Sequence, residues 1–174
     1  MSDGTTGKLR FWHPSQDAYH CAFRILMLLR HSGKEISEDM IRLLDLWLLY
    51  PQLLHRLSKP ARLKEDFDSL KVEKPQHSFL KLPSTYVLFR DVRVYQTIAL
   101  RELEARSILR YEHRQGAMVK LVDGSVPTGL MERVDAGCQN NHRLLKFLVE
   151  DLASLGALGS DGLYHRARLP RRIV

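Results

Sequence analysis

Two segments near the N-terminus are apolar on almost every side, and they constrain the fold of this chain more than any other feature. Residues 19–29 and 40–50 contain only four clearly polar side chains, which are His20, Arg24, Arg42 and Asp45. A helix on the surface of a globular domain normally carries one apolar stripe and a polar back. A chain of 174 residues has few other residues with which to bury two such helices. We therefore expect a partner protein to bury part of their surface, as in an interaction subunit.

Length and composition place the chain among soluble globular proteins. It fits one domain, or two small ones that share a core, with 44% hydrophobic and 27% charged residues. Charged residues interrupt both apolar segments, whereas a membrane span needs about 20 largely uncharged residues. The polar first eight residues predict no signal peptide. With only Cys21 and Cys138, and no CxxC, we expect a cytoplasmic protein with no membrane contact.

Helix-start signals divide the chain into segments. Ser15 or Asp17 can cap a first helix that ends near Arg30, and Ser37 can cap a second that ends near Tyr50. Pro51 suits the first turn of a new short helix. A connector rich in prolines then spans residues 58–83 and holds one short helix within 63–70. Apolar residues at helical spacing predict a third long helix over residues 84–109.

Two passages in the second half each read as a helix end, a turn and a strand-like alternation. They cover residues 102–121 and 151–169. This layout is typical of a helix followed by a β-hairpin wing, and two such units would make tandem winged helices. The predicted fold class is therefore α+β, mainly α-helical, with winged-helix-like elements. We divide the chain into an N-terminal helical region, residues 1–83, and a C-terminal winged-helix-like region with a basic tail, residues 84–174.

No common catalytic signature occurs in the sequence. The chain has no GxxxxGK[ST] or GxGxxG for nucleotide binding, no GxSxG elbow and no HExxH. No glutamate is followed two residues later by lysine, as a restriction-type nuclease would require. His13 and His20 lie near Asp17 and Cys21, but their spacing does not suit a zinc site. We therefore expect neither an enzyme nor a bound cofactor or metal.

Aromatic residues and arginines cluster around the two apolar segments. Core packing explains any single aromatic residue, but tryptophan, tyrosine and arginine also dominate interface hot spots. A buried arginine needs a charged partner, and a carboxylate of another subunit could be one. The candidate protein-interface residues are Trp12, Tyr19, Phe23, Arg24, Arg42, Trp47 and Tyr50.

Positive charge gathers toward the C-terminus of a chain whose net charge is +7. Such a charge permits contact with nucleic acid or with an acidic partner. A basic tail can also serve only as a solubilising end, and winged-helix units often dock proteins. The candidate DNA contacts are Arg143, Lys146, Arg166, Arg168, Arg171 and Arg172.

Three stretches carry a resemblance to a known family. These are Phe-Trp-His-Pro-Ser-Gln-Asp-Ala-Tyr-His-Cys-Ala-Phe-Arg-Ile-Leu at residues 11–26, Asp-Leu-Trp-Leu-Leu-Tyr-Pro-Gln-Leu-Leu at 45–54, and the long helix at 85–109 with Phe89, Gln96, Ala99 and Leu103. They resemble the small middle components of bacterial three-component ABC ATPase systems, among them the Lamassu anti-phage and anti-plasmid systems. The resemblance spans residues 11–169. It rests on packing residues and brings no catalytic residues with it.

The resemblance implies a role in a multi-component complex. It suggests a non-catalytic adaptor that bridges an SMC-like ATPase to an effector subunit, often a nuclease, in a defence complex that can include double-stranded DNA. The alternative hypothesis is a homodimeric winged-helix DNA-binding regulator, in which the apolar helices form the dimer seam. A third class, a small metal-dependent hydrolase, would require tightly bound zinc. Which surface would meet which partner does not follow from the residues.

Overall fold

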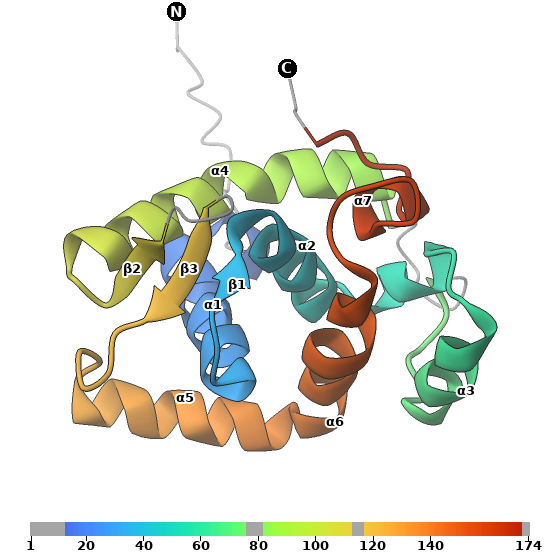
Figure 1. The fold of residues 1–174 in the computed structure, drawn as a ribbon. Coiled ribbons are helices and arrows are strands. Elements are labelled where there is room, and N and C mark those ends of the chain that lie inside the picture. The colour runs from blue at the N-terminus through green and yellow to red at the C-terminus, as the bar shows by residue number, and fades with distance from the viewer. Residues whose placement is uncertain (1–12, 76–81, 113–116, 172–174) are drawn as a thin grey trace, which may run out of the picture.

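Helices dominate the structure, and a small antiparallel sheet lies at one side. The computed structural model describes residues 13–75, 82–112 and 117–171. The predicted α+β, mainly helical class is confirmed. Figure 1 shows α1 and α2 in the middle, with α4 along one side of them and α5 along the opposite side. The four long helices are α1 (Ala18–Ser32), α2 (Glu38–Leu49), α4 (Thr85–Ala105) and α5 (Thr128–Asn140).

The helix starts follow from side-chain caps. Of the two candidates for α1, the structure uses Asp17, whose carboxylate accepts hydrogen bonds from the backbone N–H groups of Tyr19 and His20 at 2.8 and 3.3 Å. Ser37 caps α2 and Ser84 caps α4 in the same way. These caps confirm the predicted beginnings of all three helices.

The remaining elements are short and connect the long helices. A 3₁₀ turn follows Pro51, as the sequence predicted, and the connector after it holds one short helix. A π-helical segment continues α6. These elements are η1 (Pro14–Gln16), η2 (Pro51–Arg56), α3 (Ala61–Ser69), α6 (His142–Lys146), η4 (Phe147–Leu152), η5 (Ala153–Leu155) and α7 (Leu163–Arg166).

Three strands form the sheet in the order β1-β3-β2, all antiparallel. They are β1 (Ile36–Ser37), β2 (Leu109–Glu112) and β3 (Met118–Leu121). Fully buried Val119 of β3 lies opposite Ile36 on one side and Tyr111 on the other. The strand-like alternation at the end of residues 102–121 is therefore confirmed as β3, whereas β2 occupies residues that were predicted to be a helix end and a turn. The division of the chain at residue 83 stays a prediction, but strands from both sides of it meet in this sheet.

The long third helix ends earlier than the sequence predicted. It stops at Ala105, and Leu109 already begins β2. Ser107 adopts a left-handed backbone with a φ of 56°, and this reverses the chain. Ile108 and Leu109 are apolar and buried, like the core residues of α4 before them. The spacing of apolar residues along the sequence therefore did not reveal where the helix ends.

The second predicted wing is wrong. Residues 163–166 form the short helix α7 instead of a strand, and the described residues contain no second sheet. Gly162, Leu163 and Tyr164 are buried one after another, so this segment packs as a helical turn and not as an alternating strand.

The apolar helices are covered largely by the chain itself. Residues 40–48 of α2 are all buried, and α2 contacts α1, α4 and η4. The expected partner is therefore not needed to cover α2, because the later helices of the same chain fold back over it. On α1, residues 24–29 are buried, whereas Tyr19 and His20 are exposed and Phe23 is half-buried. None of the described helices combines the length and apolar character that a membrane span requires.

Candidate protein interface

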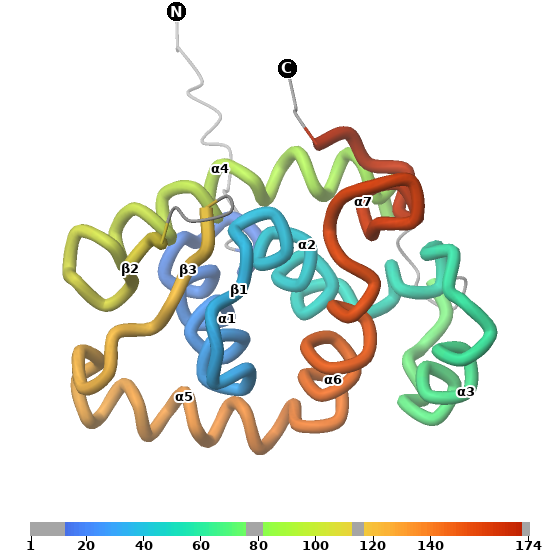
Figure 2. Tube along the Cα trace, in the orientation of Figure 1, coloured from blue at the N-terminus to red at the C-terminus, as the bar shows by residue number. Residues whose placement is uncertain are grey.

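A groove of about 740 Å³ opens between the first half of α1, the second half of α4 and the start of α5. Figure 2 shows how the chain runs from α4 through the hairpin to α5, so that the end of one helix and the start of the other lie on the same side of the molecule. Apolar residues from all three helices line the groove, including Ala22, Phe23, Leu26, Ile98, Leu103 and Leu130.

Exposed apolar side chains continue the groove onto the surface. Tyr19 of α1 is 84% exposed, and Ile98 of α4 is 44% exposed. Val94, at 61%, lies one helical turn before Ile98 on the same face of α4. Single exposed apolar residues are ordinary, but a contiguous apolar patch next to a groove marks a binding surface. This groove and its margin form the best candidate interface.

Charged side chains stand at the rim of this groove. Arg106 and Arg133 both line it, as does Glu102. The Arg106 Nε lies 3.7 Å from the Glu102 carboxylate, and both side chains are largely exposed. In the described part of the chain, no ion pair neutralises Arg133. The rim is therefore weakly positive around an apolar floor.

The structure separates the predicted interface residues into two groups. Tyr19 and Phe23 line the groove. Trp47, in contrast, is fully buried in the core, and Arg24 and Arg42 are also buried. Tyr50 is half-buried and stacks on His13 with ring centroids 6.3 Å apart. Trp12 lies outside the described residues.

Arg24 pairs with a carboxylate of its own chain. Its Nε and Nη2 donate to the two Asp45 carboxylate oxygens at 2.7 and 3.3 Å, and Gln96 Nε2 donates to the same carboxylate at 2.8 Å. Burial alone lowers the pKa of Arg24, but the adjacent carboxylate outweighs it and holds that pKa above its ordinary value. Burial, together with Asp45, also raises the pKa of the Cys21 thiol. Another subunit is not needed to neutralise this arginine.

Arg42 is also satisfied within the chain and ties α2 to α4. Its guanidinium pairs with Glu38, with one N–H···O distance of 3.0 Å, and donates to Thr97 Oγ1 at 3.2 Å. The backbone carbonyl of Arg42 accepts a hydrogen bond from Gln96 at 2.9 Å. The two arginines that interrupt the apolar helices therefore hold the core together.

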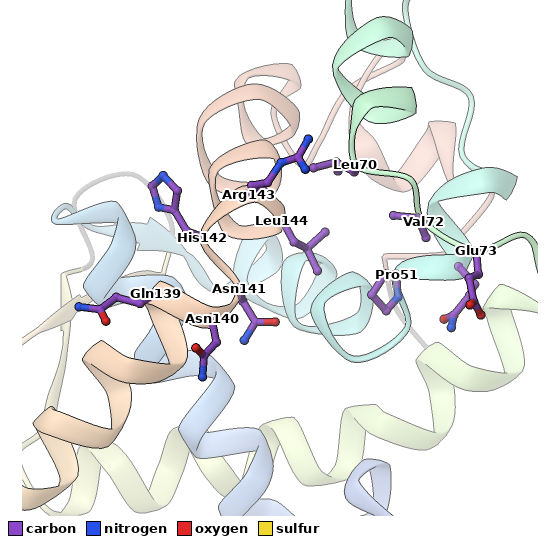
Figure 3. A pocket seen from close by; sticks show the side chains of 11 residues that line it. Pro51, Leu70, Val72, Glu73, Gln139, Asn140, Asn141, His142, Arg143 and Leu144 are labelled. Carbon is purple, nitrogen blue, oxygen red and sulfur yellow. The ribbon is translucent and has the colours of Figure 1, made fainter.

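A second cavity, of about 510 Å³, lies where α5 passes into α6 opposite the segment that follows α3. Figure 3 shows Gln139, Asn140, His142 and Arg143 around one side of it, with Glu73 across from them. Arg143, a candidate DNA contact, donates from Nη2 to the backbone carbonyl of Ser69 at 2.7 Å. Polar side chains thus line much of this cavity. One of its cations, Arg143, already has a backbone partner.

Two of the candidate DNA contacts in the tail pair with acids of the chain. Arg166 Nη2 lies 3.2 Å from Asp161 Oδ1, and Arg171 Nε lies 3.2 Å from Asp39 Oδ2. Lys146 and Arg168 are exposed. Arg172 lies outside the described residues. DNA contact by any of these residues stays a prediction.

The histidine and cysteine residues near α1 do not converge on one point. His13 Nδ1 lies 2.7 Å from Ser15 Oγ, whereas the Cys21 thiol is buried and donates to Asp45 at 3.6 Å. Across residues 13–75, 82–112 and 117–171, no group of three His, Cys, Asp or Glu side chains is placed to hold a metal ion.

Comparison with known protein families places this fold in one of them. The model of the ABC-three component (ABC-3C) system Middle Component 5 family matches residues 10–171. The chain belongs to this family. Searches of curated proteins and of solved structures gave no match. The Middle Component 5 match confirms the predicted middle component of a three-component ABC ATPase system, whose other components are its expected partners.

Of the residues that line the groove, Tyr19 and Phe23 were predicted at an interface from the sequence of this Middle Component 5 member, whereas Ile98 and Arg133 were not. Buried Phe89, Val92, Gln96, Ala99 and Leu103 define the core face of α4. Val94 and Ile98 lie away from that face. Apolar residues on the outer face of this long helix were the sequence signal that could have identified the groove.

Proposed function

We propose that this chain is a non-catalytic accessory subunit that binds an SMC-like ATPase and bridges it to an effector subunit, such as a nuclease, in a Lamassu-type defence complex. The membership in the Middle Component 5 family carries this proposal. A middle component works with an ABC ATPase and a third component, and this chain offers them a preformed apolar groove.

The hydrogen bonding of the buried polar residues favours a binding role over a catalytic one. The buried polar residues Arg24, Asp45 and Gln96 hydrogen-bond with one another inside the core. Among the described residues only Gln96 Oε1 of this group lacks a hydrogen-bond partner, and none of the three side chains lines either cavity described above. The surface feature that lacks a structural explanation is the exposed apolar margin at Tyr19, Val94 and Ile98.

The arrangement of α1, β1, α2, α4, β2 and β3, with sheet order β1-β3-β2, resembles that of a winged-helix unit. In this interpretation α4 occupies the place of the recognition helix and the β2–β3 hairpin is the wing. The outer face of α4 carries Arg90 and Arg101, but also Asp91, Val94 and Ile98. Exposed apolar side chains and an acid on this face favour protein docking over contact with phosphates.

The same winged-helix arrangement supports a second candidate function, a homodimeric DNA-binding regulator. This alternative requires duplex binding by the isolated chain, with an affinity that falls steeply as salt rises. A fluorescence-anisotropy titration with duplex DNA at two salt concentrations distinguishes the two functions. Salt-sensitive, sequence-selective binding together with a dimer in solution would favour the regulator.

Co-purification tests the accessory role. The chain is expressed with the tagged ATPase encoded in the same system, and the captured material is analysed by size-exclusion chromatography with light scattering. We expect the two proteins to elute as one complex of defined stoichiometry. A monodisperse chain that elutes alone and shows no affinity for the ATPase would overturn the proposal.

A further inference from the structure

We propose that the α1/α4/α5 groove binds an amphipathic helix of the partner ATPase whose apolar face is flanked by carboxylates. This inference rests on the proposed accessory function and adds the occupant of the groove. We take the ATPase as the source of this helix because the family belongs to ABC ATPase systems. The cross-linking experiment below distinguishes it from the third component.

The walls of the groove favour a helix over an extended strand. Most of its lining comes from α1, α4 and α5, and the backbone groups within a helix are already paired. A bound strand needs an open sheet edge, whereas a helix binds through apolar anchors at i, i+3, i+4 and i+7. Ala22, Phe23 and Leu26 of α1 and Ile98 and Leu103 of α4 line the groove together, which provides apolar surface for such anchors.

The charges at the rim favour acidic flanks on the bound helix. Arg106 already has Glu102 beside it, but Arg133 of α5 makes no ion pair within the described ranges. The chain as a whole carries a net charge of +7. Carboxylates beside the apolar anchors would meet Arg133 and Arg106, and complementary rim charges raise the rate and specificity of association.

The same charges disfavour a second copy of the chain as the occupant. In a two-fold symmetric dimer across this groove, each rim would face an identical rim. Arg106 and Arg133 of one copy would then lie near those of the other. Like charges placed together across an interface oppose binding.

A charge placed in the groove tests the inference against a matched control. Ile98→Glu introduces a carboxylate within the groove, whereas Tyr86→Glu introduces the same charge on the same helix at a similarly exposed position near its start, outside the groove. Both sites are exposed, so both variants should fold, which circular dichroism checks. In biolayer interferometry with the ATPase, we expect Ile98→Glu to weaken binding about tenfold or more. We expect Tyr86→Glu to bind within about twofold of the wild type.

A second pair of variants tests the charge argument. Arg133→Glu reverses a charge at the rim, and Arg101→Glu reverses an exposed charge of α4 that does not line the groove. We expect Arg133→Glu to slow association with the ATPase and to reduce its salt dependence, while Arg101→Glu leaves both unchanged. Equal effects of the two reversals would contradict acidic flanks on the bound helix.

Photo-cross-linking identifies the occupant directly. A benzoylphenylalanine at position 98, in the complex with all components, should cross-link an ATPase segment with apolar residues at helical spacing and Asp or Glu beside them. A cross-link to this chain, to the third component or to a segment without that pattern would overturn the inference. If the wild type binds the ATPase and Ile98→Glu binds equally well, only this inference fails. If the wild type binds no ATPase, the proposed function fails with it.

Discussion

Replacing Asp45 with asparagine should destabilise the fold strongly, because it removes the charge that neutralises Arg24. The two side chains are 0% and 9% exposed, and the Arg24 Nε lies 2.7 Å from Asp45 Oδ1. Gln96 Nε2 donates to the same carboxylate at 2.8 Å. Asparagine has nearly the same shape, but its amide offers one acceptor and no charge. Arg24 would thus remain buried without a counter-ion.

The magnitude follows from the burial of this pair. Breaking a buried ion pair by removing one partner costs about 3–5 kcal/mol. For a chain of 174 residues, each kcal/mol lowers the unfolding midpoint by about 2–4 °C. The expected fall in the unfolding midpoint is therefore about 6–20 °C. Urea denaturation followed by circular dichroism gives the free energy of unfolding directly.

An exposed ion pair provides the matched control. Arg90 and Asp91 lie 3.0 Å apart, with side chains 52% and 53% exposed, so Asp91→Asn should change the free energy of unfolding by less than about 1 kcal/mol. The double variant Arg24→Met with Asp45→Leu replaces both charges and should recover most of the loss. A loss of less than about 1 kcal/mol in Asp45→Asn alone would refute the importance of this pair.

Three further predictions test the packing around Gly162 and the burial of the ionisable side chains of Tyr164 and Cys21. Gly162→Ala should lower the unfolding midpoint, because its Cβ would collide with the backbone of residues 157 and 158, whereas Gly129→Ala has open space and should not. The pKa of Tyr164 is raised to about 12 by burial and a nearby carboxylate. Since the unfolded phenol titrates near pH 10, its contribution to stability is complete below about pH 10 and is lost as the pH rises toward 12. Urea midpoints over that range should fall, and less so in Tyr164→Phe. Cys21 should resist a thiol reagent until the chain unfolds, because burial raises the pKa of its thiol, while half-buried Cys138 should react first.

Much of the fold could be predicted from local signals. Asp17, Ser37 and Ser84 cap the three helices that the sequence placed after them, because a cap depends on a few neighbouring residues. Strand β3 was also predictable from its alternation. The pairing of β1 with β3 was not, because a strand of two residues before α2 has no pattern of its own.

The candidate site was harder to predict, because exposure depends on the tertiary packing. Residues 40–50 appeared to need a partner, but α4 and η4 cover them within the chain. Conversely, Ile98 resembled a core residue by its spacing, yet it remains 44% exposed at the groove. The periodicity of one helix shows which residues share a face. It does not show whether another helix covers that face.

Sedimentation-velocity ultracentrifugation of the purified components tests whether this chain bridges the ATPase and the third component of its system. We expect the ATPase and the third component to sediment as one species only when this chain is present. If they associate equally well without it, or if the chain sediments alone in the mixture, it does not act as a bridge.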